Sequence, residues 1–423
     1  MEETVMNIPE VVLDIANRAR TASYNLVQLK PQIKNQALLA VADALIAATS
    51  SILEKNKIDT EKAKQRGISD ALLDRLTLTP KRIDLMATSL REVAALPDPV
   101  GEVYDMKTRP NGLKVGRMRV PFGVIGFIYE SRPNVTSDAG ALCIKSGNAV
   151  ILRGGSEAFN SNRIIAQIMD DAFSQNGLPK NCVQLIPTTN REAVYELLKL
   201  DKYVNLIIPR GGRSLIEMVM ENSRIPVIKH YDGICHVFVD ADADLDMAAE
   251  IVVNSKCQRT GVCNAMETLL IHKDVAGQFA PKVAEVFRSK GVTVYANKTF
   301  KPYMPEAIDA TEKNFRTEYL AMKCNCAIVD SIEDAIAHIN KYGSHHTDSI
   351  VTTNYNASMK FVTEVDSACC HVNCSTRFSD GGEYGMGCEI GISTDKLHAR
   401  GPMGLTELTT SKFVVLGNGQ VRG

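Results

Sequence analysis

Short apolar runs alternate with amphipathic stretches along most of the chain after residue 121. The run FGVIGFIY (122–129) is one example, and the stretch 161–177 carries apolar residues every three or four positions. Such alternation is typical of parallel α/β sheets, because crossover helices cover both faces and leave the strands continuously apolar. Strands are predicted at 122–129, 149–155, 182–187, 204–209, 235–240, 267–272, 292–296, 324–330 and 348–353.

The regions outside this pattern show other periodicities. Apolar residues at three- and four-residue spacing in 29–57 and 69–96 predict amphipathic helices that pack on a larger core. Residues 103–120 form two alternating segments around the turn sequence PNG, which predicts a β-hairpin. The tail at 411–419 reads as one more strand, and an isolated strand needs a partner to be stable. Hairpin and tail together therefore suggest an element for subunit pairing.

The bulk composition is that of a globular protein with a small-molecule partner. The chain has 423 residues, 45% hydrophobic and 23% charged, enough for two main domains. Its formal net charge is −1, without long like-charge blocks, so we expect neither nucleic acid nor a membrane as partner. The acidic start lacks the features of an export signal, and no window holds about 18 consecutive apolar residues, so we expect a cytoplasmic protein.

We expect the cysteines to form neither a disulfide framework nor a metal site. There are eleven, an odd number, and without a secretory signal most should be reduced and packed in the core. The nearest approaches to a metal-binding pattern are Cys324/Cys326, Cys369/Cys370/Cys374 and the adjacent pair His345/His346. None has the paired C-x2-C spacing of a structural zinc site, and adjacent side chains diverge in an extended loop. We therefore expect no bound metal.

One cysteine lies where a thiol can react. Cys263 falls in QRTGVCNA (258–265), between a helical pattern and the strand predicted at 267–272. A loop there can expose a thiol, and Lys256, Arg259 or a nearby helix N-terminus could favour the thiolate that nucleophilic catalysis requires. The local pattern leaves open the usual alternative, an inert packed cysteine.

Two glycine-bearing turns follow predicted strands and fit anion binding. One carries Arg153 before a pair of glycines, and the other carries Arg210, Gly211 and Gly212 before a helical pattern. Free N–H groups and the positive end of a helix dipole can hold a phosphate at such turns. Neither turn matches the G-x-G-x-x-G fingerprint, and ordinary turns also use glycine, so a structural role stays open. An arginine at both turns favours phosphate.

Several longer motifs, in order along the chain, resemble one known family. They are YESRPNVT (129–136), QRTGVCNA (258–265), the run 329–350, EIGIST (389–394) and KLHARGPMGL (396–405). Through them the chain resembles the γ-glutamyl phosphate reductases, also called glutamate-5-semialdehyde dehydrogenases, of the aldehyde dehydrogenase superfamily. The resemblance runs nearly end to end.

The resemblance implies an aldehyde dehydrogenase-like α/β fold in three parts. They are a Rossmann-like NADPH-binding domain (1–102 and 122–233), an α/β catalytic domain (234–400), and a β oligomerisation element (103–121 and 401–423). The implied activity is NADPH-dependent reduction of L-glutamyl 5-phosphate to L-glutamate 5-semialdehyde and phosphate, through a cysteine thioester, in proline biosynthesis. The implied assembly is a homo-oligomer, with possible functional coupling to glutamate 5-kinase.

The resemblance also implies roles for individual residues. Cys263 is the nucleophile, and its backbone N–H stabilises the oxyanion together with the side chain of Asn134. The residues implied for NADPH are Arg153 and Ser156 at the 2′-phosphate, Gly211, Gly212 and Arg213 at the pyrophosphate, and Glu318 at the nicotinamide ribose. Those implied for the substrate are Arg132, His346 and Thr347.

One departure from the superfamily separates the alternatives. Where hydrolytic aldehyde dehydrogenases carry a glutamate base that activates water, this sequence has His230. Without that base the thioester should be protected from water, although a histidine that merely ends a strand is an equally open interpretation. The alternative functions are a CoA-acylating or other aldehyde dehydrogenase, an inactive relative acting as a scaffold, and, more remotely, a metal- or redox-sensing protein without catalysis.

Overall fold

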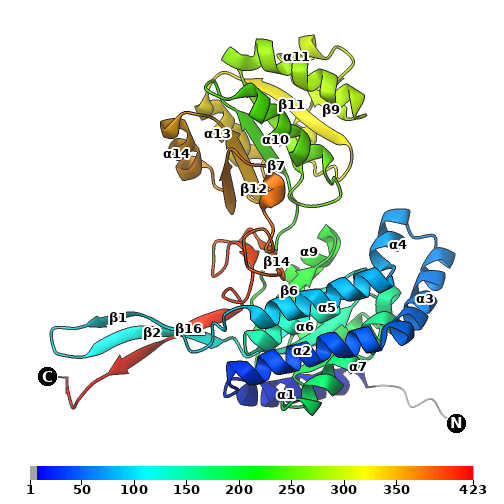
Figure 1. Ribbon diagram of the computed structural model, residues 1–423, viewed down its shortest axis with the longest axis vertical. Helices are drawn as coiled ribbons and strands as arrows, with labels where there is room; N and C mark the ends of the chain where they lie inside the picture. The colour runs from blue at the N-terminus through cyan, green and yellow to red at the C-terminus, as the bar shows by residue number, and fades with distance from the viewer. Residues whose placement is uncertain (1–6, 423) are drawn as a thin grey trace. The chain divides into compact units, whose positions relative to one another are not determined.

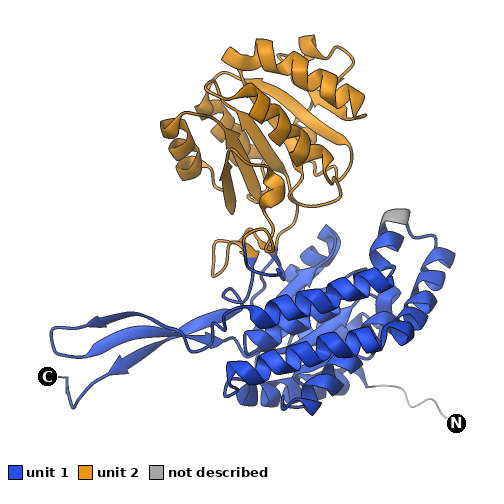
Figure 2. Cartoon of the chain, viewed as in Figure 1, with its two compact units in different colours: residues 1–229, 385–391, 403–423 blue, residues 230–384, 392–402 orange. Residues whose placement is uncertain are grey.

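The computed structural model divides into two compact units, drawn in blue and orange in Figure 2. Unit 1 comprises residues 1–229, 385–391 and 403–423, and unit 2 comprises residues 230–384 and 392–402. The structure describes residues 7–422, apart from the side chains of residues 70 and 71. The assignment of a cofactor role and a catalytic role to separate domains stays a prediction.

Unit 1 is built on a four-stranded parallel sheet with the strand order β5-β4-β3-β6. The inner strands, β3 (Val124–Tyr129) and β4 (Ala149–Gly154), are buried along almost their whole length. The remaining elements around this sheet are β5 (Val183–Leu185), β6 (Leu206–Arg210), α6 (Asn134–Lys145), η1 (Ser156–Ala158), α7 (Phe159–Gln175), α8 (Glu192–Leu198) and α9 (Arg213–Asn222). Because the strands are parallel, the turns after β3, β4 and β6 meet at one edge, where α/β sheets commonly bind ligands.

Helices from the N-terminal region complete unit 1. They are α1 (Ile8–Leu26), α2 (Pro31–Ala47), α3 (Thr49–Gln65), α4 (Asp70–Leu76) and α5 (Pro80–Ala95). Their apolar stripes are buried, as the three- and four-residue spacing predicts. Among the described residues no single helix is long and apolar enough to cross a bilayer; α2 and α3 pass that test only as a pair bent by 68°.

A separate antiparallel sheet joins the hairpin to the C-terminal strand. Its order is β1 (Val103–Thr108), β2 (Lys114–Pro121) and β16 (Thr409–Leu416), and Figure 1 shows it projecting from unit 1. The predicted hairpin and tail strand are confirmed, and they pair with each other in one chain. Apolar side chains between 39% and 66% exposed lie along these strands: Val103, Met106, Phe413, Val415 and Leu416.

Unit 2 contains a seven-stranded parallel sheet with the order β10-β9-β11-β8-β7-β12-β13. Its central strands, β7 (Cys235–Val239) and β8 (Met266–His272), are buried throughout. The other elements are α10 (Leu245–Cys257), α11 (Lys273–Ser289), β9 (Thr293–Ala296), η2 (Lys301–Tyr303), β10 (Ile308–Asp309), α12 (Glu312–Phe315), β11 (Lys323–Val329), α13 (Ile332–Tyr342), β12 (Thr347–Val351), α14 (Tyr355–Glu364), β13 (Cys369–Val372) and η3 (Thr376–Phe378). Two short strands, β14 (Gly391–Ser393) and β15 (Gly401–Met403), pair with each other.

The α/β fold class and every strand predicted from an apolar run are confirmed. The strands that the sequence did not indicate are β10, β13, β14 and β15, which have two to four residues each. Runs this short carry too few residues to show a periodicity.

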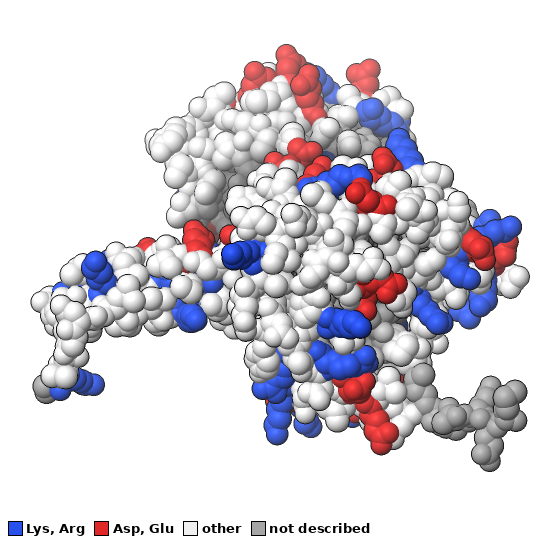
Figure 3. Space-filling model, turned by 60° about the horizontal axis from the view of Figure 1, so that its bottom comes forward, with Lys and Arg blue, Asp and Glu red and all other residues white. Residues whose placement is uncertain are grey.

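On the face of the molecule in Figure 3, basic and acidic side chains are interspersed, as the near-neutral net charge suggests.

Candidate active site

Cys263 lies in the loop between α10 and β8, at the amino end of the central strands of unit 2. The loop carries the sequence GVCN, and its Cys263 is half-buried. The side chain of Asn264 anchors the loop. Its Nδ2 donates to the carbonyl oxygen of Ser379 at 2.9 Å, and its Oδ1 accepts a hydrogen bond from the Arg377 guanidinium. The thiol is thus held in place by its neighbour in sequence and remains reachable.

A cysteine and a glycine pack against the backbone of Cys263. The thiol of Cys235, the first residue of β7, donates to the Cys263 carbonyl oxygen at 3.2 Å. Gly233 lies closer still, because a Cβ added there would fall 1.9 Å from that carbonyl oxygen and 2.4 Å from Cys263 Cα. Only a residue without a side chain fits at position 233. Sequence reasoning did not single out Gly233 or Cys235, since neither stands in a recognisable motif.

Glu318 holds Gly233 in this position. Its Oε1 accepts a hydrogen bond from the Gly233 N–H at 3.0 Å. Burial raises the pKa of Glu318, and the Gly233 hydrogen bond opposes that rise because it stabilises the carboxylate. Glu318 therefore supports the backbone on which Cys263 rests. Its proposed contact with a nicotinamide ribose stays a prediction.

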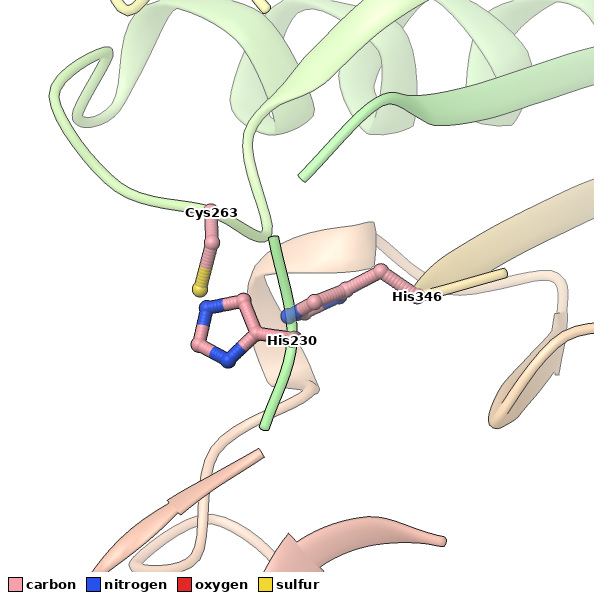
Figure 4. A group of neighbouring side chains, drawn as sticks. All are labelled: His230, Cys263 and His346. Atoms are coloured by element: carbon pink, nitrogen blue, oxygen red, sulfur yellow. The ribbon is translucent and has the colours of Figure 1, made fainter. Parts of the chain in front are cut away.

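Two imidazoles stand beside the thiol (Figure 4). One ring nitrogen of His230, one of His346 and the Sγ of Cys263 all lie within 4.8 Å of one another. The rings of His230 and His346 meet edge to face, with centroids 5.6 Å apart. His230 lies in an irregular segment before β7 and does not end a strand. A thiol with a neighbouring imidazole is the arrangement that nucleophilic cysteine chemistry uses.

The histidine next to β12 is oriented by its own neighbour. His346 is buried, and its Nδ1 lies 2.8 Å from the hydroxyl of Thr347 and 3.8 Å from the Sγ of Cys235. These contacts fix the plane of the ring. Of the three residues predicted to bind the substrate, His346 and Thr347 are therefore grouped with Cys263, whereas Arg132 lies in unit 1.

The other thiols are less suited to ionise. Burial raises the pKa of the thiols of Cys143, Cys182, Cys235, Cys257, Cys326, Cys370, Cys374 and Cys388. Cys324 and Cys369 are buried. Cys263 is the thiol that combines partial exposure with two adjacent imidazoles among the described residues.

Of the two positive charges that the sequence suggested near the loop, Lys256 is paired with a carboxylate, and Arg377 is a further positive charge nearby. Lys256 Nζ is buried and lies 2.7 Å from Glu267 Oε2, so its charge is taken up by that carboxylate. Arg377 is closer to the thiol's surroundings. Burial lowers the pKa of its guanidinium, and Arg259 lowers it further, whereas Cys263 and Cys235 are among the groups that raise it. Arg377 was not singled out from the sequence.

The comparisons with known proteins decide the family. A model of the aldehyde dehydrogenase family matches residues 9–299. The γ-glutamyl phosphate reductase of Geobacter sp. (strain M21) is 55% identical, over 99% of this chain and 100% of the relative. The crystal structure of γ-glutamyl phosphate reductase from Thermotoga maritima superposes with a TM-score of 0.95 at 46% identity, covering 97% of this chain and 100% of that chain.

This chain belongs to the γ-glutamyl phosphate reductases, within the aldehyde dehydrogenase family. An acetylating aldehyde dehydrogenase from Geobacillus thermoglucosidasius has a TM-score of 0.71 at 16% identity, over 100% of both chains, and shares the fold. Members of the aldehyde dehydrogenase family use a nicotinamide cofactor. The fold and the family that the motifs suggested are thereby confirmed.

In this reductase family member, Asn134 opens helix α6 of unit 1. Its Nδ2 donates to Asp138 Oδ2 at 2.8 Å, and burial raises the pKa of Asp138 to about 6. Arg132 lies two residues before it. The oxyanion role of Asn134 and the substrate role of Arg132 are not tested by these contacts and stay predictions.

One of the two turns predicted to bind phosphate already binds a carboxylate. The N–H of Gly212, at the start of α9, donates to Glu130 Oε2 at 2.9 Å, and Arg213 pairs with Glu217 one turn later. A Cβ at Gly211 would fall 2.5 Å from that Glu130 oxygen. The N–H at the start of α9 therefore has a carboxylate oxygen as its partner, as expected of an anion-binding turn.

The other predicted phosphate contact, Arg153, is largely buried at the end of β4. Its guanidinium donates to the carbonyl oxygens of Gly154 and Thr189, and within residues 7–422 its Nε has no hydrogen-bond partner. Ser156 follows in η1 and lines a cavity of about 720 Å³ within unit 1. Lys62 and Arg66, which the sequence did not indicate, line the same cavity.

Proposed function

We propose that this chain catalyses the NADPH-dependent reduction of L-glutamyl 5-phosphate to L-glutamate 5-semialdehyde and phosphate, a step of proline biosynthesis. The observation that supports this most strongly is the Cys263 thiol beside two imidazoles, in a chain 55% identical to a γ-glutamyl phosphate reductase over its full length. An acyl phosphate suits such a site, because a soft thiolate attacks an activated carbonyl and phosphate leaves readily.

In the first half-reaction His230 accepts the thiol proton and Cys263 becomes a thiolate. The sulfur attacks the acyl carbon, a C–S bond forms, and the C–O bond to phosphate breaks. The product is a thioester on Cys263, and the leaving phosphate takes the proton that His230 holds. The Sγ of Cys263 and one ring nitrogen of His230 lie within 4.8 Å of each other, which supports a proton transfer after a small side-chain rotation or through one water.

Each tetrahedral stage places negative charge on the carbonyl oxygen. We assign its stabilisation to the backbone N–H of Cys263 and to the Asn134 side chain. A donor of this kind contributes about 2.7–4 kcal/mol. Asp138 holds the Asn134 amide through a hydrogen bond, which would orient its remaining N–H.

In the second half-reaction the thioester carbon is reduced. The bound nicotinamide supplies the hydride for this step. The resulting oxyanion collapses, the C–S bond breaks, and the aldehyde leaves Cys263 as a thiolate. His230, at the position where hydrolytic relatives carry a glutamate base, belongs to the group formed with Cys263 and His346, so that position offers an imidazole to water in place of a carboxylate.

Several residues of unit 1 suit the phosphate groups of a dinucleotide. The turn at Gly211 and Gly212 accepts an anionic oxygen at the start of α9, which suits a pyrophosphate. Arg153, with a buried Nε that lacks a partner within residues 7–422, and Ser156 suit a 2′-phosphate, and hence NADPH. Lys62 and Arg66 line the same cavity as Ser156, together with the acidic residues Asp59, Glu130 and Glu157. Arg213 and Glu318 complete the proposed cofactor contacts.

For the substrate we propose Arg132, His346 and Thr347 as contacts to the phosphate or the amino-acid end. For assembly we propose a homo-oligomer formed through the antiparallel sheet, because its strands expose apolar side chains such as Phe413 and Val415. Functional coupling to glutamate 5-kinase is proposed because the acyl phosphate is short-lived in water.

The assay that tests the function runs the reaction in reverse. Purified protein is given NADP⁺, inorganic phosphate and pyrroline-5-carboxylate, which is in equilibrium with the semialdehyde. We expect reduction of NADP⁺ that depends on phosphate, since phosphate must attack the thioester. NADP⁺ reduction that ignores phosphate and requires coenzyme A would instead support an acylating aldehyde dehydrogenase.

Gly233→Ala is expected to lower kcat/KM about 10²-fold, because the new Cβ displaces the Cys263 backbone by about 1 Å or more. The matched control is Gly277→Ala in α11 of the same unit, where nothing lies within 4 Å of an added Cβ. Both variants are compared by steady-state kinetics in the reverse assay. Equal activity of the two would show that the Cys263 loop tolerates displacement.

A further inference from the structure

The group formed by Cys263, His230 and His346 has a second chemical property besides nucleophilic catalysis. A thiolate and two imidazoles are the donors that Zn²⁺ prefers, and here they come from three separate segments that converge on one point (Figure 4). We propose that these three residues form a Zn²⁺-binding site and that zinc reversibly inhibits the enzyme by occupying the nucleophile. The ion is an inhibitor in this proposal and has no part in the reaction.

The spacing of the donor atoms suits a tetrahedral ion. With Zn–S near 2.3 Å and Zn–N near 2.0–2.1 Å, donors of a tetrahedral site are roughly 3.3–3.6 Å apart. The three atoms here all lie within 4.8 Å of one another, so adjustments of about 1 Å close the site. Three protein ligands leave a fourth position for water, as in zinc sites that stay open on one side.

The surroundings of the three donor side chains favour the binding of an ion from solvent. His346 is buried and held by the Thr347 hydroxyl at 2.8 Å, the kind of outer contact that orients a ligating imidazole. His230 and Cys263 are half-buried, so an ion can reach them. The backbone of Cys263 is pinned by Gly233 and Cys235, which limits the freedom that binding must restrict.

The same three donor atoms predict selectivity for Zn²⁺ over Mg²⁺. Mg²⁺ prefers hard oxygen ligands in an octahedron, and none of the three donors is an oxygen. We expect Zn²⁺ to inhibit where Mg²⁺ in large excess does not. The inhibition rests on the proposed function, in which Cys263 is the nucleophile, whereas the binding does not depend on it.

The test measures binding and activity separately on the full chain, after treatment with a chelator and its removal. Zn²⁺ is titrated against a chromophoric chelator, and Co²⁺ is added as a spectroscopic substitute. We expect one Zn²⁺ per chain, a sulfur-to-cobalt charge-transfer band with the visible bands of a tetrahedral ion, and full recovery of activity on adding EDTA.

The variants assign the ligands. His230→Asn should weaken zinc binding by more than about tenfold, and Cys263→Ser should remove the charge-transfer band. His345→Asn is the matched control: its imidazole is adjacent in sequence, but its Nδ1 contacts the Asp366 carbonyl oxygen, so zinc affinity should not change. Thermal unfolding of each variant checks that the fold is retained.

Several results would overturn the site. They are the absence of stoichiometric zinc binding by folded protein, or zinc binding that is the same in His230→Asn and Cys263→Ser as in the parent chain. Zinc binding without phosphate-dependent reductase activity would reject the proposed function and leave the site standing. Reductase activity without zinc binding would reject the site alone.

Discussion

Replacing Cys263 with serine is expected to lower kcat at least about 10³-fold, in both directions of the reaction. A serine hydroxyl ionises far less readily than a thiol, even beside the two imidazoles of the site. The substitution keeps the volume of the side chain nearly constant, and Cys263 is only half-buried, so the fold should be retained. Steady-state rates and NADPH binding by fluorescence measure the two effects separately.

The control for this experiment is Cys257→Ser, six residues earlier at the end of α10. Cys257 is half-buried too, but it packs against the core cluster of unit 2, and burial raises its pKa. We expect it to keep most of the parent activity. Acyl phosphate should also label the parent chain and Cys257→Ser as a thioester by mass spectrometry, and leave Cys263→Ser unlabelled. An active Cys263→Ser beside an inactive Cys257→Ser would move the nucleophile to Cys257.

His230 links this chemistry to the choice between phosphate and water. A glutamate at this position would activate water toward the thioester, whereas this chain has His230 there. In the proposed reaction the imidazole passes the thiol proton to the leaving phosphate, so its role is completed in phosphate release and the thioester is left for reduction. The proximity of His230 to the Cys263 sulfur supports this assignment over the alternative in which the residue only ends a strand.

The fold could be predicted from the sequence because its strands are continuously apolar. Runs such as 122–129 and 267–272 are buried on both faces, so each leaves a signal within a few residues. β10 and β13 were not predicted because they have only two and four residues, too few to show a periodicity.

The residues of the candidate site were likewise predicted only in part. Cys263 was found through a family motif, since nucleophile loops keep a local sequence. Gly233, Cys235 and Arg377 each contact the loop from 28 or more residues away in sequence, and no local pattern marks them. Their role follows from packing, which a single sequence does not display. Lys256, chosen for its nearness in sequence, is paired with Glu267.

The pair formed by Lys256 and Glu267 is the most consequential structural contact near the site. Both side chains are fully buried, with Nζ and Oε2 2.7 Å apart, and Glu267 Oε1 also accepts from the Leu320 N–H at 3.2 Å. Burial raises the pKa of Glu267 to about 7, against the opposing effect of the Lys256 ammonium. Each charge is therefore tolerated in the core chiefly because of the other.

Lys256→Met is expected to destabilise unit 2 by about 3–5 kcal/mol, because it leaves the Glu267 carboxyl buried without its partner. At about 2–4 °C per kcal/mol this is a fall of roughly 6–20 °C in the thermal midpoint, measured by calorimetry. The matched control is Lys282→Met, which removes an ion pair with Asp246 at the surface and should leave the thermal midpoint nearly unchanged.

The pH dependence and a double variant test the cause of this loss. Without the ammonium the pKa of Glu267 rises further, so the folded state holds a proton that the unfolded state releases at an ordinary carboxyl pKa. Stability is then lost as pH rises, and Lys256→Met should cost more at about pH 8.5 than at about pH 6. Adding Glu267→Gln keeps an acceptor for the Leu320 N–H, removes the charge and should restore more than half of the loss. A double variant no more stable than Lys256→Met would trace the loss to packing around the lysine stem, because the charge would then be absent and the defect still present.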